Sequence, residues 1–572
     1  MHHETHIPGK DASLESSIAA LGGTLAARGF DVEEVSWLNP VEGVWSVHLR
    51  DRDCPLLFSN GKGATELAAR ASALGEFVER VSSRHFWTHY YLGETQAGAA
   101  FVHDERERWF PLPGDGSWPE GLLDESLREL YDPDRALDVG TLVDLNSGNA
   151  ARGICALPYA RLSDGETVWV PVNIVGNLYL SNGIAAGNTL AEARSQALSE
   201  VLERFVKYRV IGDCLCLPDM PETVLARHPA SAAGIAALRA AGFGIRVKDA
   251  SLGGVFPVIC VALLNPKDQG AYVSFGAHPD VGVALERALT ELLQGRALDA
   301  LDGFPAPSFD HEEVASPANL ESHFVDSDGA IAWDFLGTDA DFDFVDWNHA
   351  GTTQEEYEWL CACIQHQGYE IHAIDFTRLG AYVCRMLVPG MSEIYPLEDL
   401  EWENNSVGIP LREALVDLPA LDDTRCAQLL ETLQASGLSD ERPIWELIGL
   451  AATANDAWKH LRVGELKTLL ALAIGDEDVA RDGCSWLQHF NDLSAERAKV
   501  YRCVAALFEL HDAEPFSDAL AALFGAPTLE LATALIERRE RFFGLSRLGA
   551  NFEGSALHAK LLAAHEKLGI GR

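Results

Sequence analysis

One stretch of the sequence occurs three times, and this repeat restricts the folds that the first half of the chain can adopt. Ala73-Leu-Gly-Glu76-Phe-Val-Glu79-Arg80 matches Ala197-Leu-Ser-Glu200-Val-Leu-Glu203-Arg204, and Ala288-Leu-Thr-Glu291-Leu-Leu-Gln294 is a looser third copy. Eleven residues before each leading glutamate stands a residue that favours a helix N-cap, namely Thr65, Thr189 and Asp280. We therefore expect three helices of similar design.

The residues upstream of each helix are also alike. Apolar, strand-like runs come first, at Pro55–Phe58, Asn177–Leu180 and Ala271–Phe275. Loops that contain glycine follow, with the sequences Gly61-Lys-Gly-Ala, Ala186-Gly-Asn and Gly276-Ala-His-Pro. Each copy is thus predicted to be a strand, a loop and a helix.

The spacing of the acidic residues decides what they can bind. Residues three apart lie on the same side of a helix, so each copy presents two oxygen-bearing side chains in one direction. Together these are Glu76, Glu79, Glu200, Glu203, Glu291 and Gln294. If the three helices converge, these carboxylates need multivalent cations to ionise together, and Mg²⁺ suits such a site because it bridges carboxylates and phosphates. The alternative is a set of solvated helix faces with local ion pairs, such as Glu76 with Arg80.

Several polar residues near the repeats suit a nucleotide. Arg204 and Arg287 lie on the predicted helices, and Lys10 is a cation close to the start of the first helix. Asn188 and Glu192 stand one turn apart and suit contacts with a nucleoside. No Walker motif is present, because Gly61-Lys62-Gly63 lacks the Gly-Lys-Ser/Thr ending.

The 572 residues are too many for one ordinary core, and the pattern changes along the chain. Up to about residue 400, strand-like runs such as 167–175 and 256–264 alternate with helical patterns, which indicates an α+β domain. After about residue 415 we expect only helices, at 426–435, 463–473, 495–510 and 517–540. We place the domains at 1–412 and 413–572, with the junction near 404–422, and the second domain has a weak tetratricopeptide-like spacing.

Composition excludes some partners. The formal charge of −42, from 86 acidic and 44 basic residues, disfavours direct contact with nucleic acid or an anionic membrane. The longest apolar run, Val255–Leu264, is too short to span a membrane, and no signal peptide is evident, so we expect a cytoplasmic protein. The eleven cysteines are scattered and are expected to be reduced and mostly buried.

Several motifs together resemble the YcaO family. They are Ile7-Pro-Gly-Lys-Asp11, Asn60-Gly-Lys-Gly-Ala-Thr65, Ser181-Asn-Gly-Ile184, Leu198-Ser-Glu-Val-Leu-Glu-Arg204, Phe275-Gly-Ala-His-Pro-Asp280 and Thr290-Glu-Leu-Leu-Gln-Gly-Arg296. The resemblance, which is to enterobacterial members, also covers the helical C-terminal part. It implies a YcaO-type ATP-binding domain with an ATP site unlike that of Walker proteins, and a homodimer.

The resemblance also assigns residues to roles. Glu76, Glu79, Glu200, Glu203 and Glu291 match Mg²⁺ ligands, and of these Glu76, Glu200 and Glu291, with Arg204, are the expected catalytic groups. Lys10, Ser17, Arg204 and Arg287 match phosphate contacts, while Ser72, Asn188 and Glu192 match nucleoside contacts.

Three functions are consistent with this resemblance. Enterobacterial members are linked to RimO, which methylthiolates an aspartate of a small-subunit ribosomal protein, so the first is an ATP-hydrolysing accessory factor whose acidic surface suits a basic target. The second is ATP-dependent activation of a peptide amide; azoline formation is disfavoured because the chain ends Glu566-Lys-Leu-Gly-Ile-Gly-Arg572 instead of in a proline-rich tail. The third is an adaptor in which ATP acts only as a switch.

Overall fold

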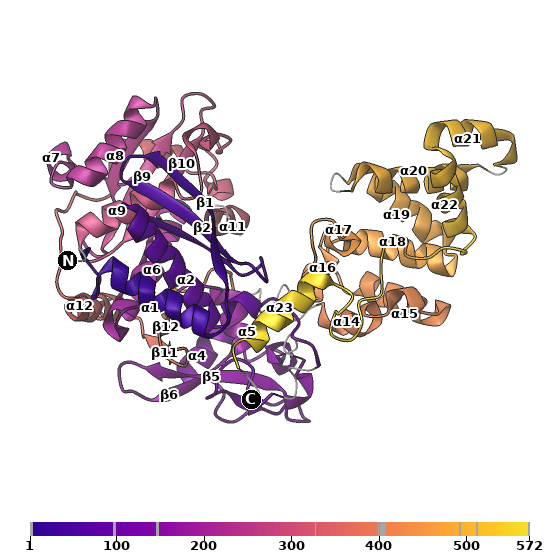
Figure 1. Cartoon of the computed structure of the whole chain (residues 1–572), viewed down its shortest axis with the longest axis horizontal. Coiled ribbons are helices and arrows are strands. Elements are labelled where there is room, and N and C mark those ends of the chain that lie inside the picture. The colour runs from indigo at the N-terminus through magenta and orange to yellow at the C-terminus, as the bar shows by residue number, and fades with distance from the viewer. Residues whose placement is uncertain are drawn as a thin grey trace.

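The computed structural model contains an N-terminal domain of strands and helices and a helical C-terminal arm (Figure 1). It describes residues 4–94, 99–144, 148–325, 328–397, 400, 408–490, 493–510 and 513–569. The N-terminal domain comprises the described residues up to 400, and the helical arm begins at α14. The predicted junction at 404–422 lies partly outside the described residues.

The strands of the N-terminal domain form three sheets. Two have three strands each, in the orders β1-β2-β3 and β10-β9-β8, and the third has the order β4-β5-β11-β12-β7 with β6 paired to β5. The strands are β1 Val32–Val41, β2 Val44–Asp51, β3 Phe58–Gly63, β4 Arg108–Phe110, β5 Ile154–Arg161, β6 Thr167–Pro171, β7 Ile184–Gly187, β8 Gly244–Asp249, β9 Val258–Leu264, β10 Ala271–Ala277, β11 His372–Phe376 and β12 Tyr382–Leu387.

Some helices of the N-terminal domain pack against these sheets, and the others pack on those helices (Figure 1). The helices are α1 Leu14–Ala27, α2 Glu66–Ser82, α4 Glu125–Tyr131, α5 Val172–Ile174, α6 Leu190–Gly212, α7 Glu222–Leu225, α8 Pro229–Ala240, α9 Val281–Leu292, α10 His311–Val314, α11 Pro317–Val325 and α12 Thr353–His366. The α+β prediction for this part is confirmed.

The three repeats are the strand–helix units β3-α2, β7-α6 and β10-α9. Each strand stands at one end of the order of a different sheet, so the repeats join three sheets around one centre. Thr65, Thr189 and Asp280 are the N-caps of α2, α6 and α9, and each side chain accepts a hydrogen bond from a backbone N–H of the first turn. The predicted helices and caps are confirmed.

The predicted strand and loop positions need correction in all three copies and at one further strand. In the first copy, β3 begins only at Phe58 and includes Gly61-Lys62-Gly63, which was predicted to be a loop; in the third, Gly276 and Ala277 likewise belong to β10. In the second, residues 177–180 are not a strand: a π-helical turn covers Val175–Tyr179, and β7 follows at Ile184. The strand predicted at 167–175 ends at Pro171, where the chain turns into α5; apolar runs this short do not distinguish a strand from a buried helical turn.

Glycine in the repeat strands allows each helix to lie very close to its strand. A Cβ at Gly61 would lie 2.0 Å from the carbonyl oxygen of Ala69 in α2, and a Cβ at Gly276 would lie 2.3 Å from that of Ala284 in α9. Both distances are far below van der Waals contact, so only glycine fits. The glycines therefore bring the backbone of each helix, with its glutamates, against the edge of its sheet.

The helical arm contains α14 Ile409–Leu415, α15 Asp423–Ala435, α16 Ile444–Leu447, α17 Ala457–His460, α18 Val463–Ile474, α19 Glu477–His489, α20 Ala495–Glu509, α21 Ser517–Phe524 and α22 Ala526–Ile536. Its helical character is confirmed. The helix predicted at 517–540 is broken at Gly525, which has φ +81°, and Pro527 follows within the first turn of α22. The tetratricopeptide-like arrangement stays a prediction.

The last helix, α23 Ala556–Glu566, returns from the arm to the N-terminal domain (Figure 1). Its residues Leu561 and Ala564 belong to the same apolar core as the β4–β7 sheet. Trp87 donates a hydrogen bond from its indole N–H to the carbonyl oxygen of Leu561 at 3.1 Å. The C-terminal helix thus ties the two parts together.

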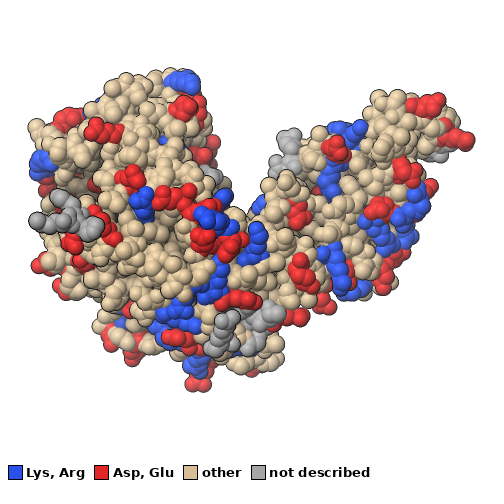
Figure 2. Space-filling view, viewed as in Figure 1, with Lys and Arg blue, Asp and Glu red and all other residues tan. Residues whose placement is uncertain are grey.

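The charged side chains on the surface and the state of the cysteines are as the sequence predicts. On the face in Figure 2, acidic and basic side chains are interspersed over both parts, and the space between the N-terminal domain and the arm is open above α23. All eleven cysteines are free, and eight of them are buried. Among the residues that the structure describes, no helix is both long enough and apolar enough to cross a membrane.

Candidate functional site

A cavity of about 1140 Å³ lies where the three repeat helices meet. Its volume is slightly above the usual range of ligand pockets, about 300–1,000 Å³. Every residue that the sequence analysis assigned to a site lines this cavity: Lys10, Ser17, Ser72, Glu76, Glu79, Asn188, Glu192, Glu200, Glu203, Arg204, Arg287 and Glu291. Gln294 lines it as well. The helices therefore converge, which was the uncertain step of the argument from the repeat.

Lys62 shows how closely the three helices approach one another. It extends from β3, and its ammonium group forms an ion pair with Glu291 of α9. Burial lowers the pKa of Lys62, and the negative charges of Glu203 and Glu76 oppose that shift. Carboxylates of α2, α6 and α9 thus all act on this one ammonium group.

The carboxylates of α2 differ in their surroundings. Glu76 forms an ion pair with Arg80 at 2.5 Å and accepts a hydrogen bond from the backbone N–H of Asn60 at 3.2 Å. The side chain of Glu79 makes no hydrogen bond or ion pair with any other described residue. Burial raises the pKa of Glu76 and raises that of Glu79 well above its usual value; the charge of Glu200 adds to the second shift. The ionised form of Glu79 is therefore not stabilised enough by the protein, and a bound cation would stabilise it.

Glu200 and Glu203 of α6 have one partner each. Glu200 forms an ion pair with Arg204 at 3.0 Å, one turn along the helix. Glu203 accepts a hydrogen bond from the backbone N–H of Ala277 at 3.2 Å, and burial raises its pKa. The local ion pairs expected of a solvated helix face are thus present, but they line a cavity.

Lys10 and three other residues of the expected nucleotide site form one hydrogen-bonded network. Lys10 makes an ion pair with Glu192 at 3.1 Å, and Glu192 accepts a hydrogen bond from the side-chain amide of Asn188 at 2.9 Å. Ser17 donates its hydroxyl to the Asn188 Oδ1 at 2.8 Å. The network joins the N-terminal segment and α1 to the start of α6.

The remaining expected residues lie nearby. Arg287 donates to the carbonyl oxygen of Ala277 at 2.8 Å and to the side chain of Gln196, and burial lowers its pKa. The guanidinium of Arg204 lies over the ring of Phe324, 4.4 Å from its centre. Ser72 is exposed, and Gln294 follows the end of α9, where its amide donates to the carbonyl oxygen of Asn60.

The chemistry of the lining fits Mg²⁺ together with a polyphosphate. Eight carboxylates and seven Lys or Arg side chains line the cavity. Mg²⁺ takes oxygen ligands such as carboxylates, whereas phosphate oxygens take Lys and Arg. The raised pKa values of Glu76, Glu79 and Glu203 have the same physical meaning, because a bound cation would favour the ionised form that burial disfavours. The residues that line the cavity therefore suit Mg²⁺ and ATP, the ligands that the sequence analysis predicted.

Sequence reasoning missed some lining residues. Lys62 was named within sequence motifs but given no role, and Glu286 and Arg296 were given none either. The alternation of strand β3 is the signal for Lys62, since Asn60 and Lys62 point to one side and both line the cavity. Glu286 shares α9 with the assigned Arg287, and burial raises its pKa.

A second group of ligand-type atoms lies elsewhere in the N-terminal domain. His103, Asp144 and Cys155 bring ligand atoms within 4.8 Å of one another. His103 Nε2 already contacts the Asp144 carboxylate at 2.6 Å, and burial raises the pKa of the Cys155 thiol well above its usual value. This group is adequately described as a buried histidine–aspartate pair beside a protonated thiol.

These features define a class of protein: an α+β domain with a large cavity of mixed charge and without a Walker sequence. The chain belongs to the YcaO family. The family model "YcaO cyclodehydratase, ATP- and Mg²⁺-binding" matches residues 60–392, and the YcaO cyclodehydratase C-terminal domain matches residues 408–572. The prediction of ATP and Mg²⁺ as cofactors is therefore confirmed.

Two relatives match the chain over nearly its full length. The ribosomal protein S12 methylthiotransferase accessory factor YcaO of Escherichia coli K12 is 50% identical over 574 residues, which cover 99% of this chain and 98% of that protein. An uncharacterized protein of Haemophilus influenzae Rd is 46% identical over 578 residues, with the same coverage of 99% and 98%.

Solved structures of the family are more distant. The YcaO protein of Methanopyrus kandleri bound with AMPPCP and Mg²⁺ is 20% identical, with a TM-score of 0.41 and coverage of 68% of this chain and 95% of that chain. A heterocyclase in complex with substrate and cofactor is 19% identical, with a TM-score of 0.47 and coverage of 69% and 56%.

Proposed function

We propose that this chain hydrolyses ATP in the cavity between α2, α6 and α9, and that it does so as an accessory factor for RimO-dependent methylthiolation of an aspartate in ribosomal protein S12. The observation that carries the proposal is that five carboxylates from three helices converge on one cavity. The same cavity is lined by Lys and Arg side chains, which can bind phosphate. The name of the E. coli relative, which matches along the whole chain, supplies the biological context.

In this proposal the side chains divide the work by charge. Glu76, Glu79, Glu200, Glu203 and Glu291 would hold Mg²⁺, which would supply positive charge to offset that of the phosphates. Lys10, Ser17, Arg204 and Arg287 contact the phosphates, and Ser72, Asn188 and Glu192 contact the nucleoside. Arg204 acts with Glu76, Glu200 and Glu291 in catalysis, because it lines the same cavity and its guanidinium lies 3.0 Å from Glu200.

The proposed partners fit the charge of the chain. A chain with a formal charge of −42 attracts a basic ribosomal protein over long distances, whereas free RNA is repelled. We further propose that the chain is cytoplasmic and forms a homodimer, as the family resemblance implies. The methylthiotransferase itself is the third component.

A reconstituted reaction tests this function. S12, a RimO-type methylthiotransferase and ATP are combined with the wild-type chain or with Glu291→Gln, and the methylthio group on S12 is followed by mass spectrometry. We expect ATP-dependent stimulation by the wild type and none by the folded variant. Equal methylthiolation with and without the wild-type chain would contradict the accessory role.

A second candidate is activation of a peptide backbone amide by ATP. The observation that favours it is the description of both matching family models as cyclodehydratase domains. Transfer of phosphate from ATP to a peptide in the absence of the methylthiotransferase would support this reaction, because the accessory role requires that enzyme. An adaptor in which ATP is only a switch predicts tight ATP binding with negligible turnover in both assays.

A further inference from the structure

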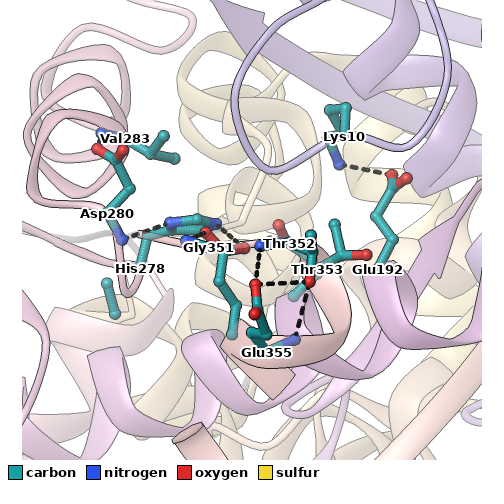
Figure 3. A network of polar contacts seen from close by, with 12 residues as sticks. Lys10, Glu192, His278, Asp280, Val283, Gly351, Thr352, Thr353 and Glu355 are labelled. Carbon is teal, nitrogen blue, oxygen red and sulfur yellow. Dashed lines mark hydrogen bonds and ion pairs between the residues drawn. The ribbon is translucent and has the colours of Figure 1, made fainter. Parts of the chain in front are cut away.

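The N-terminal segment from Ile7 to Asp11, here called the strap, runs along the cavity and carries Lys10. The strap is not part of a regular helix or strand, so its position depends on side-chain contacts. Figure 3 shows Lys10 and Glu192 beside the first turn of α12, an element to which the sequence analysis gave no role. The contacts of Gly9 and Asp11 explain how the strap is fixed.

Asp11 joins three elements through its side chain and backbone. Its carboxylate accepts hydrogen bonds from the hydroxyl of Thr353, the first residue of α12, at 2.9 and 2.8 Å. The same carboxylate accepts a hydrogen bond from Thr189, the N-cap of α6. The backbone N–H of Asp11 donates to Glu192 at 3.0 Å. The residue after Lys10 is thus bonded both to α12 and to the helix that carries Glu200 and Glu203.

Gly9 fixes the other side of Lys10. It has φ +72°, and a Cβ there would lie 2.7 Å from Nε2 of His278. His278 is itself buried, accepts a hydrogen bond from the backbone N–H of Asp280 at 3.0 Å, and faces Glu356 of α12 at 3.5 Å. The ring therefore cannot move aside easily, and the site requires glycine for both its backbone angle and its lack of a side chain.

Thr353 is well placed for a positioning role. Its side chain is buried, and it opens a helix whose N-cap, Thr352, forms a capping box with Glu355 (Figure 3). The capping box fixes the first turn of α12 without using Thr353, whose hydroxyl is free to bond Asp11. The hydroxyl of Thr353 consequently contributes to the strap and not to the helix cap.

We propose that Thr353 and Asp11, together with the close contact of Gly9 and His278, form a clasp that positions Lys10 for nucleotide binding. Thr353 and Asp11 are positioning residues, since they act through Lys10 and Glu192. The clasp predicts a change in nucleotide affinity with little change in turnover once ATP is bound. This inference rests on the proposed function for the role of Lys10, but the fixation of the strap does not.

The test compares Thr353→Val, which removes the hydroxyl at nearly constant shape, with Thr353→Ser, which restores it. Amide hydrogen exchange of residues 5–13 is measured without nucleotide, and ATP affinity and steady-state kinetics are measured with Mg²⁺. We expect faster exchange of the strap in Thr353→Val, about 5- to 10-fold weaker ATP binding with a matching rise in KM, kcat within about twofold, and recovery in Thr353→Ser. Thr432→Val, which removes an exposed hydroxyl in α15, is the matched control.

Gly9→Ala provides an independent test should Thr353→Val fail to fold. It is expected to speed exchange of the strap and to weaken ATP binding more than Thr353→Val, because the new Cβ would collide with His278. Unchanged strap exchange in the folded variants would overturn the clasp, and so would faster exchange with unchanged ATP affinity. A wild-type chain that fails to bind ATP would instead contradict the proposed function, while the exchange data would still report whether the strap is fixed by Thr353.

Discussion

Two carboxylates, the half-buried Glu79 in the N-terminal domain and the fully buried Glu465 in the helical arm, have the same chemistry and opposite surroundings. Glu465 is fully buried, forms an ion pair with Arg497, and accepts the phenol hydrogen of Tyr501 at 2.6 Å. Glu79 lines the cavity and has a pKa raised well above its usual value by burial and by Glu200, and its side chain has no hydrogen-bond or ion-pair partner among the described residues. The first carboxylate is paired within the protein through Oε1, although its Oε2 is buried without a hydrogen-bond partner among the described residues, whereas the side chain of the second has no such pair.

This difference separates a structural acid from one that serves a ligand. Glu465 is neutralised by a single guanidinium, and Arg497 also donates to the carbonyl oxygen of Phe543 at 3.0 Å. Burial and the negative charges of Glu200 and Glu76 raise the pKa of Glu79. The positive charges of Arg80 and Arg385 do not cancel this combined effect. A cluster of partly unpaired acids is costly to the folded chain, so we interpret it as a site built for Mg²⁺.

The largest effect is expected in the arm. Arg497→Met leaves Glu465 buried without its counter-charge and is expected to destabilise the chain by about 3–5 kcal/mol, as broken buried pairs do. Urea unfolding measures the loss, and ATP affinity should stay at the wild-type value. The double variant Glu465→Leu with Arg497→Met should recover most of the stability; a double variant as unstable as the single one would show that the pair is not the cause.

The next effect is expected in the cavity. Glu200→Gln keeps the shape of the side chain but removes a charge, and we expect Mg²⁺-dependent ATP binding to weaken by at least about 100-fold, since even the outer partners of metal ligands contribute about 10–100-fold. Titration calorimetry measures the affinity. Glu358→Gln on α12 is the control, because Glu358 is exposed and interacts with Gln354. If Glu200→Gln and the control bound ATP with equal affinity, Glu200 would be a structural acid like Glu465 and not a ligand of Mg²⁺.

The junction between the two parts should be sensitive to acid. Burial lowers the pKa of His558 to about 4 and that of His565 to about 3, and both lie on α23. Below pH 6.5 the unfolded chain binds protons that these folded histidines do not, so stability is full above pH 6.5 and falls as the pH drops. At pH 5 the loss is about 2 kcal/mol for each histidine.

The replacement His565→Phe isolates this contribution. Both ring nitrogens of His565 are buried without a hydrogen-bond partner among the described residues, and the ring packs on Trp87, so phenylalanine suits the position. Urea unfolding at pH 7 and pH 5 should show a smaller acid sensitivity in the variant than in the wild type. An identical sensitivity would mean that other groups cause it.

The smallest effect is expected for Ser17→Ala. The Ser17 hydroxyl is buried and donates to Asn188, which in turn donates to Glu192. Removing one neutral donor of this kind changes the free energy by about 1 kcal/mol, so we expect ATP binding to weaken by about fivefold. Fluorescence titration with an ATP analogue resolves such a change. If Ser17→Ala weakened ATP binding as much as Glu200→Gln does, Ser17 would be as important for ATP binding as the carboxylates, which would contradict the smaller role given to it here.

The sequence was sufficient to predict the three helices of the site. The N-caps Thr65, Thr189 and Asp280, and the i,i+3 spacing of the glutamates, depend only on local rules for helices. The break at Gly525 was missed because a single helix-compatible pattern runs through it. Local sequence signals thus predicted which segments are helical, but they were less reliable for where each helix begins and ends.

Long-range arrangement could not be predicted in the same way. That β3, β7 and β10 belong to three different sheets depends on strand pairing between distant segments. The return of α23 to the N-terminal domain and the bond from Thr353 to Asp11, 342 residues apart in the sequence, have no local signal. The family resemblance supplied the roles of residues, whereas the structure supplied their convergence and the anchoring of the strap.

The most direct test of the magnesium site is a crystal structure of the chain with Mn²⁺ and a non-hydrolysable ATP analogue. Mn²⁺ replaces Mg²⁺ at oxygen-rich sites and is located by its anomalous scattering. We predict anomalous peaks between α2, α6 and α9, with carboxylate oxygens of Glu79 and Glu200 among the ligands and the triphosphate beside them. A nucleotide bound elsewhere, or a cavity in which these carboxylates contact no metal, would contradict the account.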